Sequence, residues 1–297
     1  MEKILSIQNL SKKYGNITAL DNLSLDIHRG QVFGFLGPNG SGKTTTLGIV
    51  LGILGANSGG YEWFEGKYGE YHRRRIGSLL ETPNFYAYLN ADQNLDIVAH
   101  IKKSKKDNIE EILDIVNLKH RRKSKFSTYS LGMKQRLAIA SAMIGDPDVY
   151  IFDEPTNGLD PEGIAEIRSI ILRIASTGKT IFMASHILDE VEKVCSDVAI
   201  IKNGKLLATG TVGHILNDIP TIQVKATDMM ALENALKNME GLTDVRNLGD
   251  LIECGISPNM KPEEVNRRLQ QQNIILGHLS VKKKRLEEEF LAITNNN

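Results

Sequence analysis

The stretch Gly37-Pro38-Asn39-Gly40-Ser41-Gly42-Lys43-Thr44 decides the fold of this chain of 297 residues. It matches the pattern G-x-x-x-x-G-K-[ST], in which glycines let successive backbone N–H groups turn toward an anion. An apolar run at residues 32–36 precedes it and a mostly apolar run at residues 44–54 follows it, so the loop should join a buried strand to a helix. The positive end of that helix would attract phosphate. The sequence therefore predicts a site for a nucleoside triphosphate.

Each residue type in this loop has an expected part in holding the nucleotide. Lys43 should reach the β- and γ-phosphates, and the Thr44 hydroxyl should take one position on Mg²⁺. Because the γ-phosphate is the group removed in hydrolysis, Lys43 is also a candidate catalytic residue. The positions predicted to contact ATP are Gly37, Asn39, Gly40, Ser41, Gly42, Lys43, Thr44 and Thr45. A glycine-rich turn that binds nothing is the alternative, and the flanking strand and helix argue against it.

A second chemical site is expected at Val149-Tyr150-Ile151-Phe152-Asp153-Glu154-Pro155. The β-prone residues end in two carboxylates, at the end of a strand where ligands bind in an α/β sheet. Asp153 is predicted to hold Mg²⁺ through a water molecule. Glu154 is predicted to orient and partly deprotonate the attacking water, which is worth roughly 10²–10⁴-fold in rate. A helix cap or surface turn would be the ordinary use of such a pair, but the upstream phosphate loop favours the catalytic reading.

Apolar periodicity outlines the other elements of the first part of the chain. Strands are expected at residues 4–8, 20–27, 32–36, 61–64, 76–80, 149–152 and 180–184, and helices at residues 44–54, 92–101, 108–116, 131–143 and 161–175. The first two strands should form an antiparallel pair, whereas the later alternation of strands and helices favours a largely parallel sheet flanked by helices. The helical stretch from about residue 86 to 145 should form a separate lobe. The expected fold class is α/β.

Composition excludes several kinds of protein. Lys+Arg and Asp+Glu each total 36, so the chain lacks the overall basic field of a nucleic-acid binder, and short basic runs such as residues 102–106 should be solvated faces. Cys195 and Cys254 lie too far apart for a metal-binding or disulfide framework, which fits a reducing compartment. No long uninterrupted apolar stretch resembles a signal peptide or a membrane span. We therefore expect a soluble intracellular protein that binds no nucleic acid.

Several short motifs follow one another in the order and spacing of a known family. Residues 129–136 read Y-S-L-G-M-K-Q-R and resemble the signature of ATP-binding cassette (ABC) ATPases, usually L-S-G-G-Q followed by Q-R. Residues 157–160 (N-G-L-D) resemble the family's D-loop, residues 184–186 (A-S-H) its switch histidine, and Tyr14 its adenine-stacking aromatic. The resemblance covers residues 1 to about 218. It implies an ATP-hydrolysing P-loop core with an antiparallel β subdomain and an inserted helical lobe.

The resemblance also implies a head-to-tail homodimer that encloses two ATP molecules. Ser130 stands as an N-cap before residues 131–143, so its hydroxyl, the Gly132 N–H and the helix end should form an anion site. The γ-phosphate of an ATP held by the partner's phosphate loop would fill that site. By the same resemblance, Asp160 would run along the interface, and His186 would contact the γ-phosphate as a catalytic residue.

Three positions depart from the family's common pattern. Leu131 replaces the usual first glycine of the signature, and Met133 replaces the usual glutamine. Glu81 ends the strand where an amide normally touches Mg²⁺ and the hydrolytic water, so Glu81 is predicted to act as a metal ligand and in catalysis. A carboxylate there cannot donate a hydrogen bond unless it is protonated. The combination resembles ATPases of bacitracin-resistance and lantibiotic self-immunity exporters, although drift in an ABC ATPase for another drug or a lipid stays open.

That subgroup implies permease subunits on separate chains, so this chain would lie at the cytoplasmic face of the cell membrane and contact it only through the permease. The aromatic-rich residues 82–89 would line the groove that receives the permease, or would pack under the lobe. We hypothesise that Glu81 links the state of Mg·ATP to that groove. A soluble ABC ATPase acting on ribosomes or DNA, or a module that holds ATP without hydrolysing it, is the competing class. The single phosphate loop argues against the first, and Glu154 and His186 argue against the second.

The pattern changes at residues 219–297. Strands are expected at residues 221–225 and 275–281, a hairpin at residues 245–256, and helices at residues 229–239, 263–272 and 285–294. The order β-α-β-β-α-β suggests a small ferredoxin-like α+β domain. It contains no group of His, Cys or paired acids that would form a second active site. Dimerisation, regulation and simple packing are all compatible with it.

Overall fold

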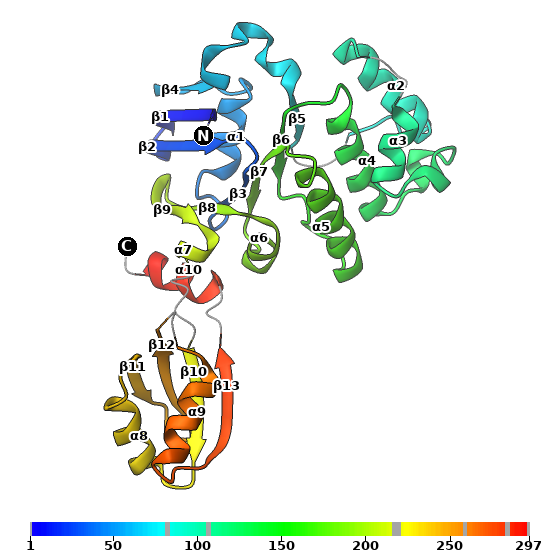
Figure 1. Ribbon diagram of the computed structural model, residues 1–297. Coiled ribbons are helices and arrows are strands. Elements are labelled where there is room, and N and C mark those ends of the chain that lie inside the picture. The colour runs from blue at the N-terminus through cyan, green and yellow to red at the C-terminus, as the bar shows by residue number, and fades with distance from the viewer. Residues whose placement is uncertain are drawn as a thin grey trace. The chain divides into compact units, whose positions relative to one another are not determined.

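The computed structural model describes residues 2–80, 84–104, 108–215, 221–257, 260–282 and 286–295 (Figure 1). The chain forms two compact units, Met1–Val212 together with Ile293–Asn297, and Gly213–Ala292. Sequence patterns alone put the boundary after residue 218 and assign the whole C-terminus to the second unit. The last residues instead belong to the first unit, where the Lys202 ammonium donates a hydrogen bond to the carbonyl oxygen of Thr294.

A six-stranded sheet in the order β5-β6-β7-β3-β8-β9 forms the centre of the first unit. Neighbouring strands are parallel except for the last pair, β8 with β9. The strands are β3 (Val32–Leu36), β5 (Ile76–Leu79), β6 (Val149–Asp153), β7 (Thr180–Ser185), β8 (Asp197–Lys202) and β9 (Lys205–Thr211). Every residue of β3, β6 and β7 is buried, as expected for parallel strands covered on both faces. The predicted α/β fold class is confirmed.

Helices of the first unit follow the strands. They are α1 (Lys43–Val50), α4 (Leu131–Met143), α5 (Pro161–Ala175) and α6 (Leu188–Val194). Both ends of α4 and α5 agree with the sequence prediction. The prediction for α1 is wrong at its C-terminal end, because the helix stops at Val50 and Gly52 takes a left-handed φ of 70°. The apolar patterns of the sequence did not indicate α6, β8 and β9.

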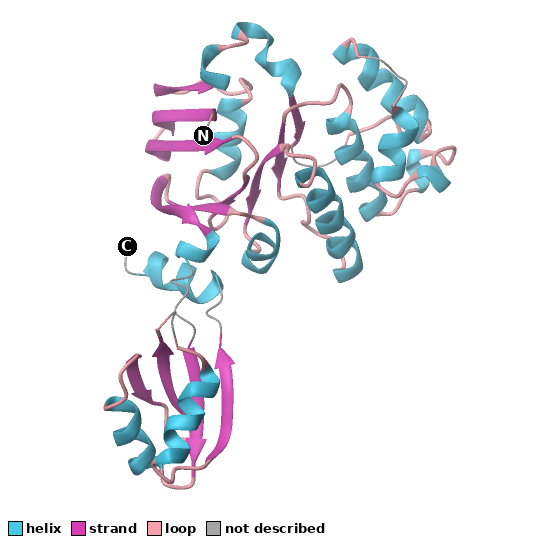
Figure 2. Cartoon of the chain, viewed as in Figure 1, coloured by secondary structure: helices cyan, strands magenta, loops and turns pink. Residues whose placement is uncertain are grey.

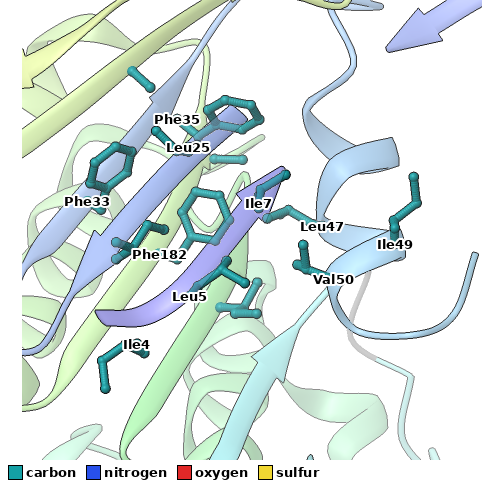
Figure 3. Packing of buried hydrophobic residues seen from close by; sticks show 14 of the residues in the cluster. Ile4, Leu5, Ile7, Leu25, Phe33, Phe35, Leu47, Ile49, Val50 and Phe182 are labelled. Carbon is teal, nitrogen blue, oxygen red and sulfur yellow. The ribbon is translucent and has the colours of Figure 1, made fainter. Parts of the chain in front are cut away.

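A second, antiparallel sheet packs against α1. It consists of β1 (Lys3–Tyr14), β2 (Ile17–His28) and β4 (Ser58–Trp63) in the order β2-β1-β4, which confirms the predicted antiparallel pair. Figure 3 shows the shared core, in which Ile7 of β1 and Leu47 of α1 lie near the aromatic rings of the central sheet. The rings of Phe35 and Phe182 lie 5.6 Å apart within it. This core fixes α1, and with it the phosphate loop, against the central sheet.

Between β5 and β6 the chain forms the predicted helical lobe (Figure 2). Its helices are α2 (Ala91–Lys102), α3 (Ile109–Ile115) and the start of α4, and its short 3-10 turns are η3 (Lys119–Arg121) and η4 (Phe126–Thr128). Two further 3-10 turns, η1 (Phe64–Gly66) and η2 (Gly69–Arg75), lie outside the lobe, between β4 and β5. Asn90 caps α2 and forms a reciprocal capping box with Gln93. Among the described residues, no helix has both the length and the apolarity needed to cross a membrane.

Lys102 corrects one expectation. The basic run 102–106 predicts a solvated face, and residues 105 and 106 lie outside the described residues. Lys102 is half-buried, and its Nζ donates to the carbonyl oxygens of Ser141, Ala142 and Ile144 at 3.0, 3.2 and 3.0 Å. These oxygens lie at the C-terminal end of α4, where helix carbonyls have no partner within the helix. Burial lowers the pKa of the Lys102 ammonium to about 8.

The second unit contains a four-stranded antiparallel sheet in the order β11-β12-β10-β13. Its elements are β10 (Thr221–Ala226), α8 (Met229–Lys237), β11 (Leu242–Asn247), β12 (Ile252–Ile256), α9 (Pro262–Gln271) and β13 (Leu276–Lys282). The short α7 (Val212–Ile215) precedes these elements and α10 (Leu286–Asn295) follows them. Ile222, Val224, Leu232 and Val265 form part of a separate core between the sheet and its two helices. The element order is β-α-β-β-α-β.

Candidate functional site

The phosphate loop runs from β3 into α1 and depends on its glycines. A Cβ on Gly37 would lie 2.4 Å from the carbonyl oxygen of Ile201, and one on Gly42 would lie 2.5 Å from that of Ala19. Gly40 and Gly42 also have left-handed φ values of 78° and 109°. At Gly37 and Gly42 a Cβ would displace backbone, whereas at Gly40 there is room for one and only the left-handed φ disfavours other residue types. The loop surrounds a cavity of about 170 Å³, lined by Ala19, Asn39, Gly40, Gly42, Lys43, Thr44 and Thr45.

Two polar side chains of the loop suit a phosphate ligand. Lys43 is only 5% exposed, and its Nζ donates to the carbonyl oxygens of Gly37 at 2.7 Å and Pro38 at 3.3 Å. The buried Ser41 Oγ has no hydrogen-bond partner among the described residues. A buried hydroxyl without a partner is costly, and a ligand oxygen can supply the missing hydrogen bond.

The neighbouring ends of β3, β6 and β7 bring the predicted catalytic residues together. The Lys43 Nζ lies 3.4 Å from Oε1 of Glu154, and the Glu154 Oε2 lies 2.7 Å from Nδ1 of His186. Glu154 therefore stands between the Lys43 ammonium and the His186 imidazole, and these two contacts orient its carboxylate. Asp153, one residue earlier, is buried at the end of β6. Glu81 lies outside the described residues.

Glu154 has an unusual backbone conformation that aims its side chain. Its φ of 49° is left-handed, and its N–H donates to the carbonyl oxygen of Ala184 in β7 at 3.0 Å. The N–H of His186 in turn donates to the Glu154 carboxylate at 3.3 Å. A glutamate with positive φ is strained, and such strain concentrates where a side chain is held for a task. The sequence does not reveal this conformation, because no glycine marks the position.

A second cavity, of about 440 Å³, lies between the starts of α4 and α5. Its lining residues are Ser130, Leu131, Gly132, Met133, Arg136, Gly158, Leu159, Asp160, Glu162, Gly163 and Glu166. Ser130 caps α4 by accepting the N–H of Met133 at 3.3 Å, as predicted. Asp160 caps α5 by accepting the N–H of Gly163 at 3.0 Å. The predicted residues thus fall into two groups within one chain, one at the phosphate loop and one at this cavity.

The aromatic predictions have mixed outcomes. Tyr14 ends β1 with 45% of its surface exposed, and the Lys12 Nζ lies 5.0 Å from the centre of its ring. In the predicted groove, the rings of Phe85 and Phe126 pack edge to face at 5.2 Å. Tyr86 and Tyr88 are exposed. The segment therefore contributes both to packing and to an aromatic surface.

Comparison with known proteins identifies the family. Residues 20–157 match the family described as ABC transporter. The bacitracin transport ATP-binding protein BcrA of Bacillus licheniformis is 44% identical over 220 residues, which cover 72% of this chain and 72% of that protein. The chain belongs to the ABC transporter ATP-binding family. Within that family, the lantibiotic transport ATP-binding protein SrtF of Streptococcus pyogenes is 42% identical over 207 residues, covering 69% of this chain and 89% of SrtF.

The ABC ATPase fold is also that of a solved relative. The structure of cbiO1 from Clostridium perfringens, part of the ABC transporter complex cbiONQ, matches with a TM-score of 0.66 at 28% identity. The match covers 73% of this chain and 92% of that chain. The predictions of an ABC ATPase core, nucleotide binding and ATP hydrolysis are confirmed. The phosphate loop and the Ser130 cavity contain residues of the motifs that resemble this family.

Arg136 and Glu166 line the Ser130 cavity and are not among the site residues predicted from the sequence. The Arg136 Nη1 donates to Oε1 of Glu166 at 3.2 Å and to the carbonyl oxygen of Asn117 at 3.1 Å. The guanidinium thus joins α4 to α5 and to the loop after α3. Arg136 ends the stretch that resembles the signature, and only this place in the sequence indicated that it could lie at the site.

Proposed function

We propose that this chain is the ATP-hydrolysing subunit of an exporter that removes a peptide antibiotic, such as bacitracin or a lantibiotic, and so gives resistance or immunity. It would act as a homodimer on separate permease subunits at the cytoplasmic face of the cell membrane. The contacts of Glu154 with Lys43 and His186 are the observation that carries the catalytic part. The printed names of BcrA and SrtF support the choice of cargo. The exposed Tyr86 and Tyr88 support a permease contact beside the lobe.

In this proposal the phosphate loop holds ATP through its backbone N–H groups and Ser41. Oxygens of the γ-phosphate would compete with Glu154 for the Lys43 ammonium. The Glu154 carboxylate would then accept a proton from the attacking water while His186 holds its other oxygen. Mg²⁺ would neutralise charge on the phosphates, and Thr44, the buried Asp153 and Glu81 are oxygen donors of the kind it binds.

The remaining residues would complete the dimer. Ser130, Gly132 and Asp160 would contact the nucleotide held by the partner subunit, because the start of α4 is an anion site that its own phosphate loop does not line. Tyr14 would stack on the adenine ring. The first compact unit would form the nucleotide-binding domain and the second unit an accessory domain.

Replacing Glu154 by glutamine tests this function. Without a proton acceptor, hydrolysis should fall by about 10²-fold or more, and ATP should remain as a link between two subunits. Light scattering after gel filtration with Mg·ATP should show a dimer for Glu154→Gln and a monomer for Glu70→Gln, an exposed glutamate in η2. The proposal fails if Glu154→Gln stays monomeric both alone and with its permease.

The cargo requires a separate test. Cells that lose this chain should become more sensitive to bacitracin or to one lantibiotic, and a copy carrying Glu154→Gln should not restore resistance. Unchanged sensitivity to both classes, combined with a normal ATP-dependent dimer, would favour an ABC exporter for another drug or a lipid.

A further inference from the structure

Leu131, the first residue of α4, lies beside the D-loop of the same chain, and both line the Ser130 cavity. The Leu131 Cδ2 lies 3.4 Å from the position that a Cβ of Gly158 would occupy. In return, the Leu159 Cδ2 lies 4.0 Å from the corresponding position on Gly132. Each leucine side chain therefore extends toward the glycine of the other segment. A glycine in place of Leu131, which is the usual residue of the signature, has no side chain that could extend toward Gly158.

An ion pair further along both helices strengthens this connection. Arg136 of α4 is only 8% exposed, and its Nη1 lies 3.2 Å from Oε1 of Glu166 in α5. A guanidinium that is nine-tenths buried is costly to leave unpaired, so this contact resists separation of the helices. The apolar contact lies at the helix starts and the ion pair lies one or two turns further along. Two attachments at different depths restrict both sliding and rotation of α4 on α5.

We propose that Leu131 and the Arg136–Glu166 pair lock the signature to the D-loop within one protomer, and that this lock couples the two nucleotide sites of the dimer. The inference depends on the dimer proposed above. When the partner's nucleotide binds at Ser130, the start of α4 moves, and the locked D-loop moves with it. Leu131 is thus a positioning residue, and its replacement of glycine strengthens cooperativity between the sites.

Cooperativity of ATP hydrolysis tests the lock. The wild type should give a Hill coefficient well above 1, with an upper limit set by the two sites. Leu131→Gly should lower it toward 1, whereas Leu131→Met should keep the wild-type value because methionine fills a similar volume. The affinity of the monomer for a fluorescent ATP analogue should change less than about twofold in both variants, because Leu131 does not line the phosphate-loop cavity.

Folding defects can be separated from loss of the lock. Leu131 is 47% exposed, and Leu131→Ala removes the contact while keeping a good helix former at the start of α4. Glu166→Ala should lower the Hill coefficient through the second attachment. The inference is overturned if Leu131→Gly and Leu131→Ala keep the wild-type Hill coefficient, or if the wild type itself shows none above 1. By contrast, failure of Glu154→Gln to trap a dimer would overturn the proposed function.

Discussion

Replacing Gly42 by alanine should destabilise the first unit strongly, because two costs coincide at this position. A Cβ there would lie 2.5 Å from the carbonyl oxygen of Ala19 and 2.7 Å from the Leu20 Cδ2. Forcing a methyl group into such a space costs about 1–3 kcal/mol. The left-handed backbone adds about 1–2 kcal/mol for any residue with a Cβ. The free energy of unfolding should therefore fall by about 2–5 kcal/mol, or about 4–20 °C in Tm for a unit of this size.

A matched substitution separates the two costs. Gly178 also has a left-handed φ, of 79°, but a Cβ there would meet nothing within 4 Å. Gly178→Ala should therefore lose only the backbone contribution, about 1–2 kcal/mol. The difference between the two variants measures the close approach of the phosphate loop to β2.

The single tryptophan makes this comparison specific to the first unit. Trp63 is buried in the core beside α1, and its Nε1–H donates to the carbonyl oxygen of Val50 at 2.7 Å. Its fluorescence during urea unfolding should report the midpoint for wild type, Gly42→Ala and Gly178→Ala. Equal midpoints for the two variants would refute the reasoning, because the contact with Ala19 would then contribute nothing.

Two further predictions concern Lys102 and Asp160. Burial lowers the pKa of Lys102 from 10.5 to about 8, so the unfolded chain binds more protons than the folded chain between these pH values. The free energy of unfolding of the wild type should therefore rise with pH across that window, relative to that of Lys102→Met. Lys103→Met, a change at the exposed neighbour, should keep the wild-type slope in the same urea titrations. Asp160→Ala should lower the free energy of unfolding by about 0.5–2 kcal/mol by removing the α5 cap, whereas Asp160→Asn should retain most of it. Equal stability of these two Asp160 variants would show that the cap contributes nothing.

Local signals explain why much of the fold could be predicted. The sequence predicts α4 and α5 at both ends because Ser130 and Asp160 are strong N-caps and Pro161 suits the first helical position. The glycine loop predicts β3 and the helix after it. By contrast, α6 has seven residues and no side-chain cap, and β8 and β9 follow it closely, so no boundary signal separated them. Short elements of this kind depend on tertiary packing, which a single sequence does not display.

Some residues of the candidate site could likewise be predicted from the sequence, and others could not. Motif spacing predicts Lys43, Glu154 and His186, and the parallel order of β3, β7 and β6 brings them together at one edge. The Arg136–Glu166 pair joins residues on different helices, and neither residue type nor spacing indicates a partner 30 positions away. The environment of Lys102 could not be predicted for a related reason. A run of lysines is typical of a solvated surface, and the sequence does not show that the C-terminal end of α4 lies beside Lys102.

Helix α4 connects the Ser130 cavity to β5, although β5 and Ser130 lie far apart in the sequence. The 13 residues of α4 begin at the Ser130 cap and end beside β5, a distance of roughly 20 Å along the axis. At that far end Gly77 has no side chain, and a Cβ there would lie only 2.3 Å from the carbonyl oxygen of Ala142. Lys102 binds the same helix end through three carbonyl oxygens. A helix held this closely cannot tilt at its signature end without a matching displacement at β5, the strand that leads into the segment containing Glu81.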